Sequence, residues 1–379
     1  MVTGIICEYN PLHAGHKKQL DLIRATDPQG TIVCLMSGNF VQRGKPAVFD
    51  KMLRAKAAVL CGADLVLELP IGYALSSAEG FAAGGVDILG KLCHRLCFGA
   101  EQADTTRFIE TATALEKPDF PLFLRERLQT GLSFPAARQA ALEDMGLDAS
   151  LLSSPNNILG VEYCKAIISQ NSKMKPFPIL RQGDYHDKTA DAENPSATAV
   201  RALLERNENW QSYVPAETIH IFSGASVHTM KHGEKAVLAK LRTMSDTEFE
   251  SLPYGSEGLW RKLMHACRKE SSLEDILTAV KTKRYTRTRL DRMVMCAFLG
   301  INESQLQEKA PYTRILGFNN RGREILKEAR ATGNFINIGQ DTEHPYALLE
   351  QRASSLYSLF AENPESPSGY SNDRVFYLD

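Results

Sequence analysis

Short apolar runs alternate with longer amphipathic stretches along the first hundred residues. The runs at 3–7, 31–36 and 64–69 have the length of buried strands, and a fourth run ends at residues 99–101. Stretches with helical spacing separate these runs. Continuous apolar strands that alternate with helices are typical of a parallel sheet covered on both faces. The pattern therefore predicts a doubly wound, Rossmann-like α/β domain.

Most of the remaining chain is predicted to be helical. Up to residue 206, the pattern predicts helices within 104–152, 158–168 and 196–206, and a strand over 178–181. Beyond that point runs of β-branched residues are few, and helical patterns cover 217–241, 246–251, 258–268, 273–282, 286–299 and 321–330. We therefore expect an α/β domain over residues 1–206 and a mostly α-helical domain over residues 207–379.

Composition and charge exclude several classes of protein. The 379 residues include 44 Lys and Arg against 45 Asp and Glu, so the chain is not basic overall in the manner of a histone-like protein. With 43% hydrophobic residues it can form a core, and no apolar run reaches the roughly 18 residues of a membrane-spanning helix. No basic leader precedes Glu8, which favours a cytoplasmic location over secretion.

The eight cysteines are scattered, mostly within apolar stretches, as buried free thiols are. Cys93-His94-x-x-Cys97 is the one cluster that partly resembles a zinc site. It lacks a second pair of ligands nearby, whereas structural zinc needs four converging ligands. No set of carboxylates marks another site, so we expect no residue of this chain to form a dedicated metal site.

The most specific feature follows the first predicted strand. It is the stretch EYNPLHAGH at residues 8–16, in which an Asn-Pro turn leads into a helix. His13 and His16 are three residues apart, so they share a helix face beside the unpaired N–H groups and the positive dipole end. Gly15 keeps side-chain bulk away from the backbone. The pattern predicts a nucleotide site in which both imidazoles donate to phosphate oxygens, although surface or capping histidines are the alternative.

The H-x-G-H motif resembles the signature of the nucleotidyltransferase superfamily, the HIGH-type fold shared with class I aminoacyl-tRNA synthetases. Together with further stretches it is similar to the tRNA(Met) cytidine acetate ligase family. In chain order these are MSGNFVQRGKPA at 36–47, GADLVLELP at 62–70, CFGAE at 97–101, PNNILGVEY at 155–163, DYHD at 184–187, SATAVR at 196–201 and KTKRYTRTRL at 281–290. The resemblance extends to about residue 325 and implies a nucleotidyltransferase-like α/β domain.

The resemblance also implies an enzyme that uses ATP and acetate. Acetate is activated as acetyl-adenylate with release of pyrophosphate, and the acetyl group is then transferred to the exocyclic amine of the wobble cytidine of elongator tRNA(Met). Mg²⁺ is expected to arrive bound to ATP. We expect neither a membrane nor DNA as a partner.

Individual residues are assigned from the matching motifs. His13 and His16 are expected to be catalytic. The residues expected to bind ATP are Ile6, Cys7, Glu8, Tyr9, Asn10, Pro11, Leu12, His13, Ala14, Gly15, His16, Lys17, Lys18, Gln19, Gly99, Asn156, Arg181, Gln182, Ser196 and Thr198. Structural alternatives are a turn for Gly99, a helix cap for Asn156 or Ser196, a surface charge for Arg181, and an ion pair for the unassigned Arg43 and Glu68.

Positive charge gathers between residues 261 and 330, which contain sixteen Lys and Arg against eight Asp and Glu. The residues expected to bind tRNA lie in its densest part and are Lys281, Lys283, Arg284, Arg287 and Arg289. At helical spacing Lys281, Arg284 and Arg287 would line one face, with Tyr285 as a stacking ring. A solvated helix face is the alternative, and the run alone does not distinguish tRNA from other polyanions.

Two other functions stay open at this point. A small-molecule adenylyltransferase shares the H-x-G-H turn but commonly needs only the α/β domain. A non-enzymatic factor that binds RNA or the ribosome is the second alternative, against which the intact His13, Gly15 and His16 argue. ATP–pyrophosphate exchange separates the three, because it depends on acetate in the ligase, on a phosphorylated metabolite in the transferase, and is absent from the binding factor.

Overall fold

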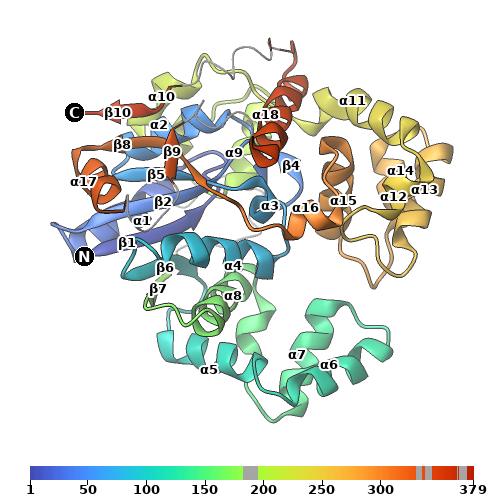
Figure 1. Cartoon of the computed structure of the whole chain (residues 1–379). Helices are drawn as coiled ribbons and strands as arrows, with labels where there is room; N and C mark the ends of the chain where they lie inside the picture. The colour runs from blue at the N-terminus through green and yellow to red at the C-terminus, as the bar shows by residue number, and fades with distance from the viewer. Residues whose placement is uncertain (182–194, 330–334, 338–343, 365, 367–373) are drawn as a thin grey trace.

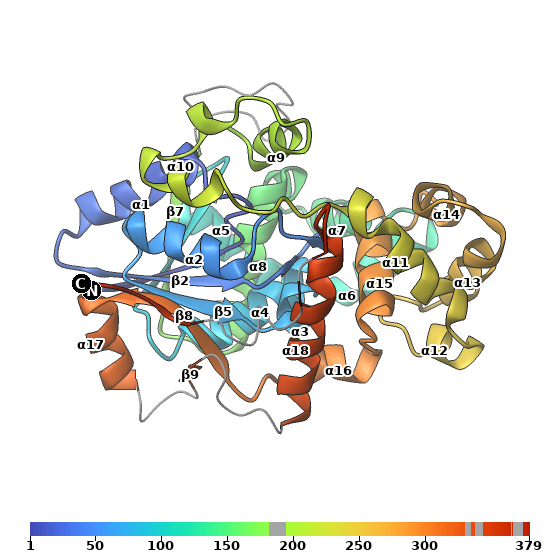
Figure 2. The same ribbon diagram turned by 90° about the horizontal axis from the view of Figure 1, so that it is seen from above.

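The computed structural model describes residues 1–181, 195–329, 335–337, 344–364, 366 and 374–379. Within these residues the chain forms one large mixed sheet with helices on both faces (Figures 1 and 2). A group of helices, α11 to α15, lies to one side of the sheet, and α5 to α7 form another group (Figure 1). None of the described helices is both long and apolar enough to cross a membrane.

Five neighbouring parallel strands make up most of the sheet, and they confirm the predicted doubly wound α/β fold. They are β1 (Val2–Cys7), β2 (Thr31–Ser37), β5 (Leu65–Leu69), β6 (Arg95–Ala100) and β7 (Lys175–Leu180). The order along the sheet is β10-β8-β5-β2-β1-β6-β7. After β1 the chain adds strands on one side and later on the other. The order therefore reverses between β1 and β6, which is where such sheets bind ligands.

Helices connect the strands and make up most of the described second half of the chain. Up to residue 206 they are α1 (Ala14–Thr26), α2 (Lys51–Leu60), α3 (Ile71–Ala74), α4 (Ala78–Leu89), α5 (Thr105–Leu115), α6 (Phe120–Gln129), α7 (Phe134–Asp144), α8 (Pro155–Ser169) and α9 (Ala197–Glu205). Beyond it they are α10 (Ala216–Phe222), α11 (Met230–Thr243), α12 (Asp246–Glu250), α13 (Leu259–Lys269), α14 (Leu273–Val280), α15 (Arg287–Leu299), α16 (Glu303–Gln307), α17 (Asn320–Ala329) and α18 (Pro345–Tyr357).

One predicted helix is wrong in its extent. The pattern over 217–241 corresponds to two helices, α10 and α11, with residues 223–229 between them. That connection contains serine and glycine, which are poor helix formers. The hydroxyl of Thr229 accepts a hydrogen bond from the N–H of His232 at 3.3 Å, so α11 begins with a cap of its own.

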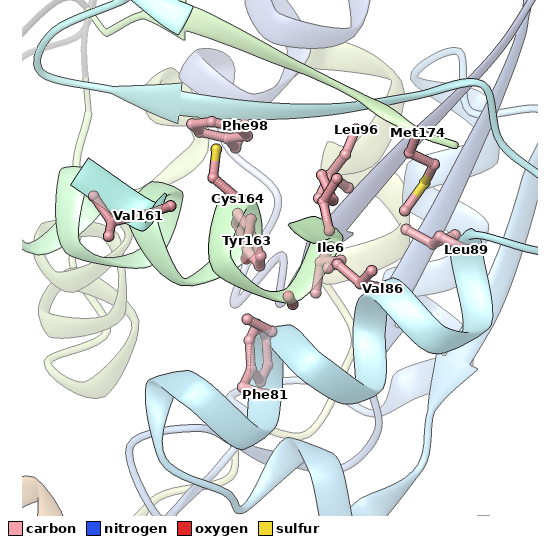
Figure 3. Close-up of a cluster of buried hydrophobic side chains, with 14 of the residues drawn as sticks. Ile6, Phe81, Val86, Leu89, Leu96, Phe98, Val161, Tyr163, Cys164 and Met174 are labelled. Carbon is pink, nitrogen blue, oxygen red and sulfur yellow. The ribbon is translucent and has the colours of Figure 1, made fainter. Parts of the chain in front are cut away.

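The two faces of the sheet are covered by different helices, because successive side chains of a strand point to opposite sides. Ile5 packs in the layer with α1 and α2, whereas Ile6 packs in the layer with α4 and α8. Figure 3 shows the second layer, where Ile6 of β1, Phe81 of α4 and Tyr163 of α8 approach one another. These three side chains also line the cavity described below.

Three strands from the later part of the chain extend the sheet, which the sequence pattern did not predict. β8 (Thr313–Asn319) pairs antiparallel with β5, and both β9 (Phe335–Asn337) and β10 (Phe376–Leu378) pair parallel with β8. The sheet thus takes strands from both sides of residue 206. The division of the chain into domains at that residue stays a prediction.

A short hairpin lies between β2 and α2. It is formed by β3 (Phe40–Val41) and β4 (Lys45–Pro46), which pair antiparallel. The ring of Phe40 is buried in the hydrophobic core shared by α11, α13, α14 and α15. This hairpin therefore joins the α/β sheet to the helical group.

Candidate nucleotide-binding site

A cavity of about 610 Å³ opens at the carboxyl ends of β1, β6 and β7. Its walls include the residues that end these strands and those that begin α1, α8 and α9. We call it the central cavity. It lies at the point where the strand order reverses, and the N-termini of α1 and α9 on its wall favour a negatively charged ligand.

The turn between β1 and α1 holds the two histidines against each other. The Nδ1 atom of His13 accepts a hydrogen bond from the N–H of Gly15 at 3.1 Å, and the Nδ1 atom of His16 accepts one from the N–H of His13 at 3.3 Å. Their rings are stacked, with centroids 3.7 Å apart. A neutral imidazole whose Nδ1 accepts carries its proton on Nε2. His13 thus caps the helix, as the alternative proposed, and both rings still have an Nε2–H donor on the cavity wall.

Both histidines are neutral near pH 7. Burial lowers the pKa of His13 to about 3, and the positive charges of Arg181 and Arg201 add to this effect. Burial, followed by His13 and Arg181, lowers the pKa of His16 well below its usual value. Because the rings are uncharged donors, they can bind anionic oxygens without giving up a proton.

Arg181 follows β7 and lies against Gly99 of β6. Its backbone N–H donates to the carbonyl of Ala100 at 2.9 Å. A Cβ atom at Gly99 would lie 3.0 Å from Cγ of Arg181, so the glycine leaves room for the arginine stem. Gly99 is therefore part of a strand and not of a turn. Burial lowers the pKa of Arg181, yet an arginine stays charged and can pair with phosphate.

The start of α9 brings a second arginine to the same wall. The hydroxyl of Ser196 caps the helix by accepting from the N–H of Ala199 at 3.1 Å. Arg201, one turn later, donates to the carbonyl of Asn10 at 2.7 Å and to the hydroxyl of Thr198 at 3.1 Å. Arg201 therefore ties α9 to the turn that carries His13. The sequence motif SATAVR contains this arginine, whose charge could add to the phosphate contacts at this helix start.

Asn156 lies at the start of α8 and does not cap that helix. Its side-chain amide donates to Oε1 of Glu101 at 2.7 Å. The other carboxylate oxygen of Glu101 accepts from the N–H of Asn157 at 2.9 Å, so Glu101 satisfies the helix start. Asn156 lies on the cavity wall.

The structure brings most of the expected ATP-binding residues together. Those that line the central cavity are Ile6, Cys7, Glu8, Tyr9, Asn10, His13, Gly15, His16, Lys18, Gln19, Gly99, Asn156, Arg181, Ser196 and Thr198. Those of the motif that do not line it are Pro11, Leu12, Ala14 and Lys17. Leu12 is fully buried in the core beneath α1, and Lys17 pairs with Asp21 on the exposed side of the helix. Gln182 and the stretch 184–187 lie outside the described residues.

The hairpin supplies cavity residues that sequence reasoning left out. Gln42, Arg43 and Lys45 line the cavity. The backbone N–H of Gln42 donates to the carboxylate of Glu8 at 2.8 Å, and its side-chain amide donates to the carbonyl of Ser76 at 3.2 Å. The stretch MSGNFVQRGKPA at residues 36–47 contains all three residues and is the sequence signal for them.

Glu68 has the structural role that was its alternative. Its two carboxylate oxygens accept from Nζ of Lys51 at 2.8 and 2.9 Å, and both side chains are buried. Glu68 does not line the central cavity. Its carboxylate is paired within the protein, as the alternative expected.

Within the described part of the chain, no group of three or more His, Cys, Asp or Glu side chains is placed to hold a metal ion. Cys93 and Cys97 are buried free thiols. The Nδ1 atom of His94, between them, accepts a hydrogen bond from the N–H of Val2 at 3.0 Å. This cluster therefore packs around the first half of β6, between β1 and β7.

The basic residues at 281–289 do not form one helical face, so that prediction is wrong. α14 ends at Val280 and α15 begins at Arg287, because Thr286 caps α15 through the N–H of Arg289. The arginines have protein partners: Arg284 donates to Glu257 at 2.8 Å and Arg287 to Glu274 at 2.7 Å.

The same segment still presents positive charge. Lys281, Lys283 and Arg284 are exposed in the loop before α15. The guanidinium of Arg289 lies over the ring of Tyr285, 4.9 Å from its centroid. The charge is therefore spread over a loop and the first turn of a helix.

Comparison with known proteins identifies the family. A family model described as HIGH Nucleotidyl Transferase matches residues 1–372. The tRNA(Met) cytidine acetate ligase of Clostridium acetobutylicum is 36% identical over 383 residues, which cover 94% of this chain and 95% of that protein. The protein of the same name from Acetivibrio thermocellus is 33% identical over 398 residues, with 96% of each chain covered.

Solved structures agree with this match. The crystal structure of Thermotoga maritima TmcAL without ligand superimposes with a TM-score of 0.91 at 30% identity, covering 100% of this chain and 99% of that one. The structure of the same protein bound with alpha-thio ATP has a TM-score of 0.87 at 30% identity and covers 100% of both chains. The chain therefore belongs to the HIGH nucleotidyl transferase family and, within it, to the tRNA(Met) cytidine acetate ligases.

Proposed function

We propose that this protein activates acetate with ATP and transfers the acetyl group to the exocyclic amine of the wobble cytidine of elongator tRNA(Met). The observation that carries the proposal is the convergence of His13, His16, Arg181 and Arg201 on one cavity. Neutral donors and fixed cations at helix N-termini suit a triphosphate. The related T. maritima structure that binds alpha-thio ATP supports ATP as the ligand. We expect the reaction to take place in the cytoplasm.

In the first step, an acetate oxygen attacks the α-phosphorus of ATP. The bond from that phosphorus to the bridging oxygen breaks, and pyrophosphate leaves with the electron pair. Negative charge grows on the phosphate oxygens, to which the Nε2–H groups of His13 and His16 donate, while Arg181 and Arg201 balance the charge. The step requires no proton transfer, which agrees with the low pKa values of the two histidines.

In the second step, the cytidine amine attacks the carbonyl carbon of acetyl-adenylate. A carbon–nitrogen bond forms, the bond from that carbon to the phosphate oxygen breaks, and AMP leaves with the electron pair. One amine proton is released to water or to the phosphate of AMP. The main task of the protein here is to hold the two reactants in line, because the adenylate is already a good electrophile.

Mg²⁺ fits this site as an ion carried by the ATP phosphates. Among the described residues that line the cavity, Glu8 is the sole carboxylate. Mg²⁺ commonly takes one or two carboxylates together with phosphate oxygens and water. Glu8 would be the protein ligand, and the ion would neutralise charge on the triphosphate.

The tRNA is proposed to bind at the loop and helix start that contain Lys281, Lys283, Arg284, Arg287 and Arg289. Positive side chains there can contact the phosphate backbone, and a base can stack on Tyr285. The wobble base must leave the anticodon stack to enter a cavity, as in other enzymes that modify bases.

One experiment tests the whole proposal. The purified protein is incubated with tRNA(Met), ATP and isotopically labelled acetate, and the wobble nucleoside is analysed by mass spectrometry. We expect labelled acetylcytidine, together with ATP–pyrophosphate exchange that depends on acetate. Exchange that depends instead on a phosphorylated metabolite would support a small-molecule adenylyltransferase, and no exchange under any condition would support a binding factor.

A further inference from the structure

The β3–β4 hairpin contacts two functional regions at once. Its residues Gln42, Arg43 and Lys45 line the central cavity. Its other side contacts α15. The first turn of this helix belongs to the stretch 281–289, which we call the basic segment. Figure 1 shows β4 beside α15, at the boundary between the sheet and the helical group.

The contact with α15 is made backbone to backbone. Gly44 has a φ of +69°, and a Cβ atom there would lie 2.4 Å from the backbone nitrogen of Arg292 and 2.5 Å from the carbonyl carbon of Asp291. No side chain fits between the two elements. Nη1 of Arg292 also donates to the carbonyl of Gln42 at 3.3 Å, which adds a polar link at the same place.

The hairpin is held in place at its first strand and at its turn. Phe40 packs in the helical core, with its ring centroid 5.9 Å from those of Tyr357 and Phe360. The N–H of Gln42 donates to Glu8, which follows β1 and precedes the turn of His13. A continuous set of contacts therefore runs from Arg292 through Gln42 to Glu8 at the nucleotide site.

The basic segment lies close to the contact between Gly44 and Arg292. Arg292 lies five residues after Arg287, which is about 7.5 Å along the helix axis. A helix turn that moves when RNA binds would displace Gly44, because there is no flexible side chain between them to absorb the shift. The displaced hairpin would carry Gln42, Arg43 and Lys45 with it.

We propose that the hairpin positions the cavity wall in response to RNA bound on α15, with Gly44 and Arg292 as the positioning residues. RNA binding and nucleotide binding are then coupled in free energy. This inference rests on the proposed function, since it takes tRNA as the ligand of the basic segment. Coupling of this kind is reciprocal: whatever factor tRNA imposes on nucleotide affinity, the nucleotide imposes on tRNA affinity.

The test measures binding of α,β-methylene-ATP to the full-length protein with and without saturating tRNA(Met), and binding of tRNA(Met) with and without the nucleotide. We expect the wild type to show the same change in both affinities, about fivefold or more. In Gly44→Ala and Arg292→Gln we expect each ligand to change the affinity for the other by less than about twofold. Arg292→Lys keeps a donor for the Gln42 carbonyl and is expected to recover part of the factor.

Gly131→Ala is the matched control. Gly131 has a similar left-handed φ of +86°, and a Cβ atom there meets nothing within 4 Å. Alanine in a left-handed conformation costs a similar conformational free energy at both positions, but only Gly44→Ala collides with α15. We expect Gly131→Ala to keep the wild-type factor. Thermal melting identifies a variant that has failed to fold, in which case Arg292→Gln carries the test.

Two results would overturn the inference. One is a wild-type protein in which each ligand changes the affinity for the other by less than about twofold. The other is a folded Gly44→Ala or Arg292→Gln protein in which this change in affinity is as large as in the wild type. The proposed function fails separately, through the absence of acetylcytidine in the mass-spectrometric assay. A protein that forms acetylcytidine without coupled binding would retain the function and refute only the role of the hairpin.

Discussion

Replacing His16 by Asn separates the two roles of this side chain. In the protein, Nδ1 of His16 accepts a hydrogen bond from the N–H of His13 at 3.3 Å, and Nε2–H lies on the cavity wall. The Oδ1 atom of an asparagine occupies nearly the same place as Nδ1 and accepts the same bond. The start of α1 is therefore kept, and only the donor that we propose for the phosphates is lost.

The size of the loss follows from the environment of the donor. A hydrogen-bond donor aimed at charge that develops in a site with little water is worth about 2.7–4 kcal/mol, or about 10²–10³ in rate. The stacked ring of His13, whose centroid is 3.7 Å away, remains, and we propose that it donates to the same group of oxygens. We therefore expect the lower end of this range, a decrease of about 100-fold in the kcat of acetate-dependent ATP–pyrophosphate exchange.

Steady-state exchange kinetics and thermal melting check this expectation together. The melting temperature of His16→Asn should stay close to that of the wild type, because the capping bond is preserved. His16→Gln places an amide near the position of Nε2 and should recover part of the rate. Exchange by a folded His16→Asn protein within about fivefold of the wild type would refute the assignment of His16 as a phosphate donor.

Three further predictions concern pH, a buried ion pair and RNA binding. The pKa of His13 is about 3 in the folded protein and about 6.5 in the unfolded chain, so as the pH falls below ~6.5 the unfolded chain binds the proton first. The free energy of unfolding should therefore decrease by about 1.4 kcal/mol for each unit that the pH falls from ~6.5 to ~3, with no contribution from His13 above that range. Urea unfolding at pH 7.5 and 5.5 should show this part of the slope missing from His13→Asn. Lys51→Met leaves Glu68 buried without its cation and should cost about 3–5 kcal/mol in urea unfolding, whereas Lys51→Met with Glu68→Leu should cost less. Lys281→Ala with Lys283→Ala should flatten the plot of log tRNA affinity against log salt concentration by about 1–2 in slope, as measured by filter binding.

The features that depend on neighbouring residues could be predicted from the sequence. The strands β1, β2 and β5 are short, mostly apolar runs, and the nucleotide turn is a compact motif between a strand and a helix. The positions of His13 and His16 at the start of α1 follow from this local pattern. The same holds for Ser196, which precedes α9 and caps it.

The features that depend on distant residues could not be predicted from the sequence. β8 pairs with β5 across some 250 residues of sequence, and no local period encodes that partner. The charge of the basic segment was evident, but its break at Thr286 and its pairing with Glu257 and Glu274 were not. Gly44 was one of several glycines in the sequence, and only its contact with α15 distinguishes it.

The place of β8 has a consequence for synthesis of the chain. Until residues 313–319 have left the ribosome, β5 has no neighbour on its outer side, and a strand with open N–H and C=O groups is prone to pair with another chain. The nascent amino-terminal half must wait for most of the polypeptide before this side of β5 is covered. A fragment that stops short of β8 should therefore aggregate, even though it contains both histidines.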